Sequence, residues 1–401
     1  MSRFILLLEV PLQIRRLRTS VTFFQSTHPP PEIATPKNMS ANMKMDIEIL
    51  DALDEKKQAE WNEFYDSVIH QHPRQSPRFA NVDERNFRGV RYAIGRIDGR
   101  IVACGAFVLS AHPYLRNVIR EARCMCGPLC DDPELMFSFI NQLRRHPKFK
   151  SVGQICISPY WLEDDARVLN TTAKSAGWKN YEQRGEYRKT GVIDLTLDHD
   201  QLLARFSKSA KKNYQKAIKM GVESRNITTI DGANRLYEIM ELTLGSRNVS
   251  FYKREYYMDL FESILKEGIH GVLIGSYIGD ELLGGCMNFR SSVAGHLRIL
   301  VMDTARINAH GNLRLSPFIL MNCFMWAQKH GCTRFDLEGY DDPENSPKTL
   351  KNVHAYKSKV APKPMLRFAD HKKINNTMVH VSGNMKQIAK SNLRSLRQKL
   401  T

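Results

Sequence analysis

The sequence predicts a mixed α/β fold built from two similar units in tandem, each a mostly antiparallel sheet flanked by helices. The 401 residues, 42% of them hydrophobic, are enough for two domains with their own cores. Two segments resemble each other, RYAIGRIDGRIVACGAF from Arg91 and GVLIGSYIGDELLGGCMNF from Gly271. Both occur in the same order of helix, hairpin, helix and strand. This repeated order makes chance similarity the weaker interpretation.

The two similar segments are predicted β-hairpins. Each contains Ile-Gly and a second glycine four residues later, and the flanking apolar residues alternate as in paired strands. Gly99 and Gly279 stand beside Asp98 and Asp280, where a tight hairpin turn requires a positive φ.

The elements around the hairpins follow from their hydrophobic periodicity. In the first half, a helix over 61–70 precedes the hairpin, and a helix over 132–145 and a strand over 152–157 follow it. In the second half, the corresponding elements are helices over 233–244 and 256–266, a helix over 315–330 and a strand over 333–337.

The two ends of the chain differ from the rest. Residues 1–45 begin with an arginine-rich, acid-poor stretch and continue into a proline-rich one, which is typical of a disordered leader or an organellar targeting segment. Later methionines, Met39, Met43 and Met45, leave a misassigned start as the alternative. Residues 347–401 carry thirteen Lys and Arg against one acid, Asp370. We expect 371–401 to form a basic tail, either solvated or bound to an anionic partner.

Composition excludes several classes of protein. No apolar run approaches the length of a membrane span, so we expect a soluble protein. The eight cysteines lack disulfide-framework spacing, which favours a reduced, cytoplasmic setting. Cys124, Cys126 and Cys130 lack zinc-knuckle spacing, so we predict no metal site. Motifs of serine hydrolases, P-loop NTPases, dinucleotide-binding folds and zinc peptidases are absent from the sequence.

A basic helix is predicted between the two units, over 206–220, with Gly221 as its C-cap. Its lysines recur at intervals of three and four residues, so one face presents several ammonium groups. Such a face binds a diphosphate or an RNA backbone, or it is simply solvated. We favour the anion-binding role because of the helix's place between the units. The lysines in question are Lys208, Lys211, Lys212 and Lys216.

A charge reversal marks the segment 335–359. A short strand with alternating polarity ends at Gly339, an acidic loop follows, and several lysines, including Lys357, come next. Polar residues at a strand end and a change of charge sign within one loop favour a substrate site over a plain connector.

The order of elements resembles that of GNAT-type acyltransferases, and two such units joined by a basic helix resemble the Fem aminoacyltransferases and their FemAB-like relatives. The resemblance covers about 46–370, with units over 46–200 and 201–370. It rests on four motifs, one of which is residues 336–339, similar to the family's Asp-x-Gly-Gly. Residues 127–131 (GPLCD) resemble the family's Gly-Pro-Val-x-Asp, residues 208–222 its basic helix, and Tyr356-Lys357 its Phe-Lys pair.

The resemblance implies the roles of the site residues. Lys357 lies beside the reacting carbonyl, where its charge would stabilise an oxyanion, and Asp131 or Asp336 would accept the amine proton. Asp131 is also a candidate helix N-cap, as is Asp132. Glu338 replaces the first glycine of the family's Asp-x-Gly-Gly, and the Phe-Gly that follows the family's lysine is missing. Substrate binding is carried over to Lys208, Lys211, Lys212, Tyr214, Lys216, Tyr356, Glu338 and Gly339.

The implied function is an N-acyltransferase that moves an acyl or aminoacyl group from acyl-CoA or aminoacyl-tRNA to an amine, with a nucleotide- or lipid-linked peptidoglycan precursor as one acceptor. It needs no cofactor besides this co-substrate, because the enzyme acts mainly by positioning. The alternative is a basic module that binds RNA or another anion on the same fold without catalysis. Its support is the basic tail, together with Glu338 and the missing Phe-Gly.

Overall fold

The computed structural model of the chain describes residues 45–383, except 88, 116–117, 181–188, 246–252, 267–269, 341–350 and 362–363. Of the predicted leader 1–45 it therefore contains only Met45, whose side chain is buried. The acidic loop after Gly339 and the end of the predicted basic tail also lie outside the described residues. In the described segments, no helix combines the length and the apolar character needed to cross a membrane.

The first sheet combines an antiparallel meander with one parallel pair. Its strand order is β1-β2-β3-β4-β5-β15-β6, in which β4 and β5 are parallel and the other neighbours antiparallel. Its strands are β1 Asp46–Leu50, β2 Val90–Ile97, β3 Arg100–Ala111, β4 Ile119–Cys124, β5 Gln154–Ile157, β6 Lys179–Asn180 and β15 His371–Ile374. The helices of this half are α1 Glu55–Ser67, the 3₁₀ turn η1 Pro73–Gln75, α2 Pro77–Asn86, α3 Pro133–Arg145, α4 Pro147–Lys150 and α5 Glu163–Ser175.

The second sheet has the order β8-β13-β12-β11-β10-β9, with β12 and β13 as its parallel pair. Its strands are β8 Val192–Asp194, β9 Glu223–Asn226, β10 Gly271–Ile278, β11 Glu281–Arg290, β12 Ala294–Met302 and β13 Arg334–Asp336. The helices of this half are α6 His199–Arg205, α7 Lys208–Lys219, α8 Ile230–Gly245, α9 Arg254–Lys266, α10 Thr304–Ala309, α11 Ser316–Lys329 and α12 Lys351–Lys357. A short third sheet pairs β7 Lys189–Thr190 with β14 Met365–Leu366.

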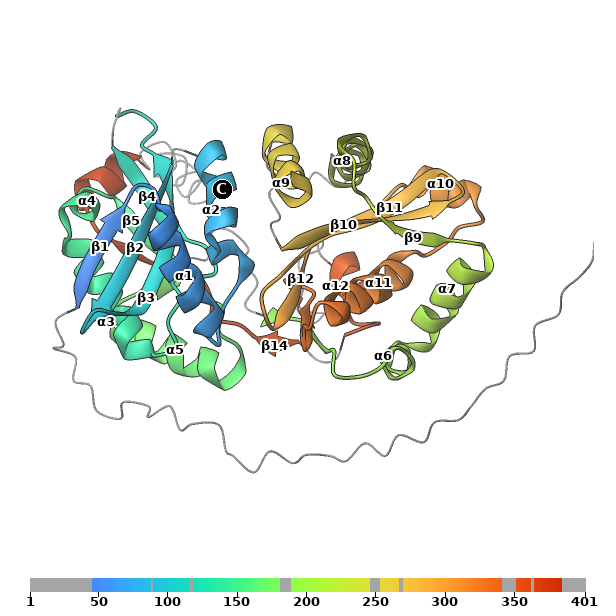
Figure 1. Cartoon of the computed structure of the whole chain (residues 1–401), viewed down its shortest axis with the longest axis horizontal. Helices are drawn as coiled ribbons and strands as arrows, with labels where there is room; N and C mark the ends of the chain where they lie inside the picture. Colours follow the sequence, from blue (N-terminus) through green and yellow to red (C-terminus); the bar gives the residue numbers. More distant parts are fainter. Residues whose placement is uncertain are drawn as a thin grey trace, which may run out of the picture. The chain divides into compact units, whose positions relative to one another are not determined.

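The two main sheets are copies of one topology. Strands β9 to β13 take the places of β1 to β5, and β8 takes the place of β15 beside the last parallel strand. Figure 1 shows the two sets of strands, β1 to β5 in blue and cyan and β9 to β12 in green to orange. Both hairpin turns have the predicted backbone, with φ of 76° at Gly99 and 57° at Gly279. The predicted repeat and the α/β fold class are confirmed.

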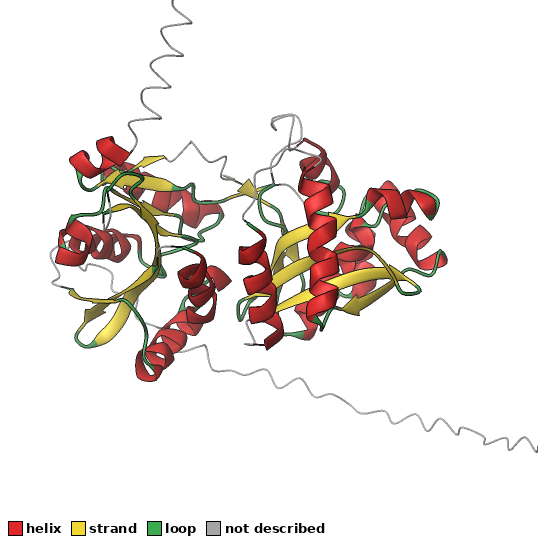
Figure 2. Ribbon diagram, turned by 90° about the horizontal axis from the view of Figure 1, so that it is seen from above, coloured by secondary structure: helices red, strands yellow, loops and turns green. Residues whose placement is uncertain are grey.

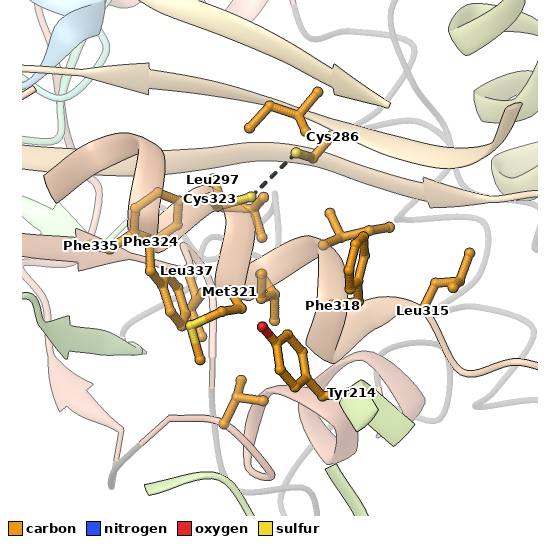
Figure 3. Packing of buried hydrophobic residues seen from close by; sticks show 14 of the residues in the cluster. Tyr214, Cys286, Leu297, Leu315, Phe318, Met321, Cys323, Phe324, Phe335 and Leu337 are labelled. Carbon is orange, nitrogen blue, oxygen red and sulfur yellow. Dashed lines mark hydrogen bonds between the residues drawn. The ribbon is translucent and has the colours of Figure 1, made fainter. Parts of the chain in front are cut away.

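Helices cover both faces of each sheet (Figure 2). In the first half, α3 and α5 bury their apolar residues on one face, and α1 and α2 pack on the other. In the second half, α8 and α9 cover one face, and α7 and α11 cover the other. Figure 3 shows the core under α11, in which Tyr214 of α7 lies close to Phe318. Because both faces are buried, each sheet is a rigid support for the loops at its strand ends.

The chain crosses between the sheets at two places that differ from the predicted boundaries. Strand β8 lies in the predicted first unit (46–200) but pairs with β13 of the second sheet. Strand β15 lies in the predicted tail (371–401) but pairs with β5 and β6 of the first sheet. These strands have three and four residues, so their sequences carry too little periodicity to identify the sheet that they join.

Candidate active site at the end of strand β13

The loop after β13 is organised by a buried lysine. Lys357 of α12 donates hydrogen bonds from Nζ to the carbonyl oxygens of Leu337, Glu338 and Gly339, at 2.8, 2.6 and 2.8 Å. These three bonds use all the ammonium protons. Burial lowers the pKa of Lys357 to about 8, against the opposing effects of Glu338 and Asp336. The geometry therefore makes Lys357 the group that holds the strand end, and its oxyanion role stays a prediction.

Asp336, the last residue of β13, is also buried and fully hydrogen-bonded. Tyr160 donates its hydroxyl to Oδ2 at 2.5 Å, the backbone N–H of Glu338 donates to Oδ1 at 2.6 Å, and Thr190 donates its hydroxyl to Oδ1. Burial and the nearby Asp336 carboxylate together raise the pKa of Tyr160 well above its ordinary value, so the phenol keeps its proton. Asp336 is only 1% exposed. Its environment is that of an anchor rather than of a base open to substrate.

Asp131 lies in the first half, at the start of α3. Its carboxylate accepts hydrogen bonds from the backbone N–H groups of Ile69 and His70, at 3.0 to 3.3 Å, and Asp132 supplies the N-cap of α3. Of the two predicted caps, Asp132 is therefore the one observed. Asp131 is exposed. It holds the loop after α1 in place, and its role as a proton acceptor is untested.

Two histidines and Tyr160 form a buried ring cluster next to Asp336. The ring centroids of His72 and His296 lie 4.3 Å apart, and each lies 5.2 Å from that of Tyr160. Both ring nitrogens of His296 are buried without a hydrogen-bond partner among the described residues. Burial lowers the pKa of His296 to about 4, although Asp336 acts in the opposite direction, so the ring is neutral near pH 7.

We expect the stability of the protein to fall in acid because of His296. Its pKa is lower in the folded chain than the ordinary 6.5 of an unfolded chain, so the unfolded state binds more protons between pH 6.5 and 4. The stabilisation is complete above pH 6.5 and is lost as the pH falls toward 4, by up to about 3 kcal/mol. Urea unfolding at pH 7 and pH 5 should show a smaller difference in His296→Gln than in the parent. Equal differences would contradict the assignment.

Arginines surround the ring cluster on several sides. Arg74 donates to the hydroxyl of Tyr256 at 3.1 Å, and Arg367 lies over the Tyr160 ring at 5.6 Å. Arg298 approaches Glu338 at 3.9 Å, and its Nε is buried without a partner among the described residues. Three acids, Asp83, Asp336 and Glu338, lie near these arginines and compensate much of their charge. The buried Nε of Arg298 is a donor that suits an anionic group of a ligand.

The basic helix predicted over 206–220 is α7, Lys208–Lys219, and its C-cap is Met220 rather than Gly221. Ser207 accepts from the N–H of Ala210, and Gly221 follows the C-cap with φ of 73°. Its predicted substrate-binding residues differ in exposure. Tyr214 is buried, with its hydroxyl 2.9 Å from Nε2 of His199. The lysines face outward to different degrees: Lys208, Lys212 and Lys216 are exposed, and Lys211 is half-buried.

A cavity of about 800 Å³ opens in the second half, beside Tyr356. Strands β12 and β13 pair only from Ala294 to His296, and β12 continues to Met302, which lines the cavity. The N-terminus of α11, which has no side-chain cap, forms another wall. Both polar and apolar side chains line the cavity. The polar ones are Asn213, Thr304, Asn308, Asn312, Arg314, Ser316, Tyr356 and Lys359.

The loop between α10 and α11 lines this cavity through Asn312, Leu313 and Arg314. Gly311 and Asn312 take positive φ of 77° and 57°, and Lys216 of α7 donates to the carbonyl oxygen of Gly311 at 2.7 Å. Lys216, which was predicted to bind substrate, therefore contacts this loop.

Sequence reasoning missed His72, Tyr160, His296, Arg298 and Arg367. Single residues of these types at irregular spacing carry no recognisable motif, and several of their contacts join segments more than a hundred residues apart in the chain. Among the described residues, no group of three or more His, Cys, Asp and Glu could hold a metal ion.

Comparison with known proteins agrees with this topology. The solved structure of FemX matches with a TM-score of 0.70 at 13% identity, over 83% of this chain and 98% of that chain. A conserved protein of unknown function from Bacteroides thetaiotaomicron matches with a TM-score of 0.53 at 9% identity, over 82% and 99%. L-PGS from Bacillus licheniformis matches with a TM-score of 0.50 at 12% identity, over 84% and 98%. No curated protein matches the chain in sequence.

The fold is thus that of a tandem GNAT-like protein, two acyltransferase-type units in one chain. The model of the FemAB family matches residues 56–274, more than half of the sequence. The chain belongs to the FemAB family.

Proposed function

We propose that this protein is an N-acyltransferase that moves an acyl or aminoacyl group from a phosphate-bearing donor, acyl-CoA or aminoacyl-tRNA, to an amine. The observation that carries the proposal is the 800 Å³ cavity bounded by the end of β12, α7, α10, the N-terminus of α11 and α12. Tyr356 lines it, and the neighbouring Lys357 holds the polar strand end. A donor in the cavity would therefore present its acyl group close to Glu338 and the ring cluster.

The walls of the cavity suit such a donor. Leu313, Pro317 and Val360 provide apolar surface for an acyl chain or a base, and Arg314 and Lys359 provide positive charge. The free N–H groups at the N-terminus of a helix and its dipole attract phosphate. A volume of this size is within the range of cofactor and ligand sites.

In the same proposal, the acceptor binds to the first half. Asp131 is exposed there, and the loop that it holds carries His70 and leads into His72. A nucleotide-linked peptidoglycan precursor combines an amine with phosphates, and the arginines near the ring cluster would suit the phosphates. This acceptor is the first to test.

The test is transfer of a labelled group. Purified protein is incubated with [¹⁴C]acetyl-CoA or [¹⁴C]alanyl-tRNA and a nucleotide-linked peptidoglycan precursor, and the product is separated and counted. We expect transfer from one of the two donors. Loss of label to water alone, with no labelled amide from either donor, would contradict the proposal.

Filling the cavity should weaken binding of the donor. Ala355 lines the cavity on α12, so we expect Ala355→Trp to raise the KM for the donor at least tenfold and to leave the KM for the acceptor nearly unchanged, because the indole occupies donor space. Ala204→Trp, at an exposed position of α6, is the matched control. An unchanged donor KM in Ala355→Trp would place the donor elsewhere.

The alternative, a basic module that binds RNA without catalysis, is supported by the exposed lysines of α7. Filter binding of tRNA across a salt series separates the two functions. A module that works through phosphate contacts loses affinity steeply with salt. Equal affinity for charged and uncharged tRNA, together with no transfer, would favour the module.

A further inference from the structure

Glu338 has a backbone conformation that normally requires glycine. Its φ is 50°, in the left-handed region where a Cβ atom is unfavourable. The conformation is fixed from both sides, because its N–H donates to Asp336 at 2.6 Å and its carbonyl accepts from Lys357 at 2.6 Å. The end of β13 thus has the left-handed backbone conformation typical of glycine, and the long acidic side chain of Glu338 in this conformation lowers the stability of the fold.

The alternation of side chains at the end of β13 places Glu338 next to the ring cluster of His72, Tyr160 and His296. Asp336 is buried in its hydrogen bonds, and Leu337 packs in the core of the second half (Figure 3). The Glu338 side chain is 28% exposed. Strain at a partly exposed polar residue between two buried positions, Leu337 and Gly339, is a feature of functional sites.

The carboxylate has neighbours but no close partner. Oε1 lies 4.0 Å from Nε2 of His72, and Oε2 lies 3.9 Å from a guanidinium nitrogen of Arg298. No described residue donates a hydrogen bond to either oxygen. Both lone-pair regions are therefore open to a ligand.

His72 is a neutral neighbour of the carboxylate. Its Nδ1 accepts from the N–H of Arg74 at 3.2 Å, so the neutral ring carries its proton on Nε2, the nitrogen facing Glu338. Burial lowers the pKa of His72 well below its ordinary value, and His296 and the arginines act in the same direction. The ring therefore leaves the carboxylate's negative charge uncompensated on that side.

We propose that the Glu338 carboxylate accepts the proton of the attacking amine, an inference that rests on the acyltransferase function proposed above. The amine nitrogen forms a bond to the acyl carbon, and the carbonyl π electrons move to oxygen. The N–H proton passes to Glu338. The oxyanion then collapses, the C–O or C–S bond to the donor breaks, and Glu338 returns the proton to the leaving oxygen or sulfur.

Three variants separate this role from a structural one. Glu338→Gln keeps the shape and the strained backbone, Glu338→Gly removes both the carboxylate and the strain, and Asp98→Gly relieves a similar φ of 51° in the β2–β3 turn, far along the chain from the site. We expect Tm to rise in both glycine variants and to stay unchanged in Glu338→Gln. With the labelled donors and the precursor above, kcat should fall at least a hundredfold in both Glu338 variants and stay unchanged in Asp98→Gly.

Each outcome has a distinct meaning. A lower Tm in Glu338→Gly would overturn the proposal, since the side chain would then serve the fold. A parental kcat in Glu338→Gln would overturn it while leaving the acyltransferase function intact. A parent protein that transfers label from neither donor removes the proposed function, and this inference with it.

Discussion

Lys357→Met is expected to lower the free energy of unfolding by about 3–5 kcal/mol. The substitution leaves three buried carbonyl oxygens, those of Leu337, Glu338 and Gly339, without their donor, and each unsatisfied group costs about 1–3 kcal/mol, partly relieved by relaxation. It also removes a positive charge beside Asp336. Urea unfolding followed by tryptophan fluorescence measures the loss.

Lys359→Met is the matched control, because this lysine lies two residues further on and is exposed. It should change the free energy of unfolding by less than about 0.5 kcal/mol. A loss in Lys357→Met no larger than that of the control would show that the three carbonyl contacts contribute little to the fold.

A double variant connects this lysine with the strained glutamate. If Lys357 holds Glu338 in its left-handed conformation, removing the strain should make the lysine less important. We expect Lys357→Met to cost less in a Glu338→Gly background than in the parent, by roughly 1 kcal/mol.

The repeat and the site motifs were visible in the sequence because their signals are local. The hairpin turns depend on one or two residues, and Gly99 and Gly279 have the predicted positive φ. The predicted helix over 315–330 is α11 within one residue at each end. The motif at 336–339 could be located in the sequence, because alternating polar and apolar residues followed by a glycine predict the end of a strand.

The packing around the motif could not be predicted from the sequence. Tyr160 meets Asp336, and His72 meets His296, across separations that leave no pattern in either segment. The sequence pointed to Lys357, but its partners are main-chain oxygens, which have no sequence signature. For Glu338, the departure from the family's glycine left the backbone geometry open. The positive φ of Glu338 shows that the backbone keeps the conformation expected of the family's glycine, although this residue carries a side chain.

Asp336→Ala is the second change with a large expected effect, a loss of about 3–5 kcal/mol. It removes the acceptor of Tyr160, Thr190 and the Glu338 N–H, and it leaves Lys357 and Arg367 without a buried countercharge.

A double-variant cycle with Tyr160→Phe tests how much of that loss comes from the contact between the two halves. Tyr160 follows β5 of the first sheet, and Asp336 ends β13 of the second, so their 2.5 Å hydrogen bond joins them. Tyr160→Phe alone should cost about 1.5–3 kcal/mol, as expected for a buried bond to a carboxylate. In the Asp336→Ala background it should cost much less, with a coupling energy of at least about 1 kcal/mol. Strictly additive losses would mean that Asp336 stabilises its own strand end rather than the contact between the two halves. The positions of Glu338 and the ring cluster would then not depend on Tyr160.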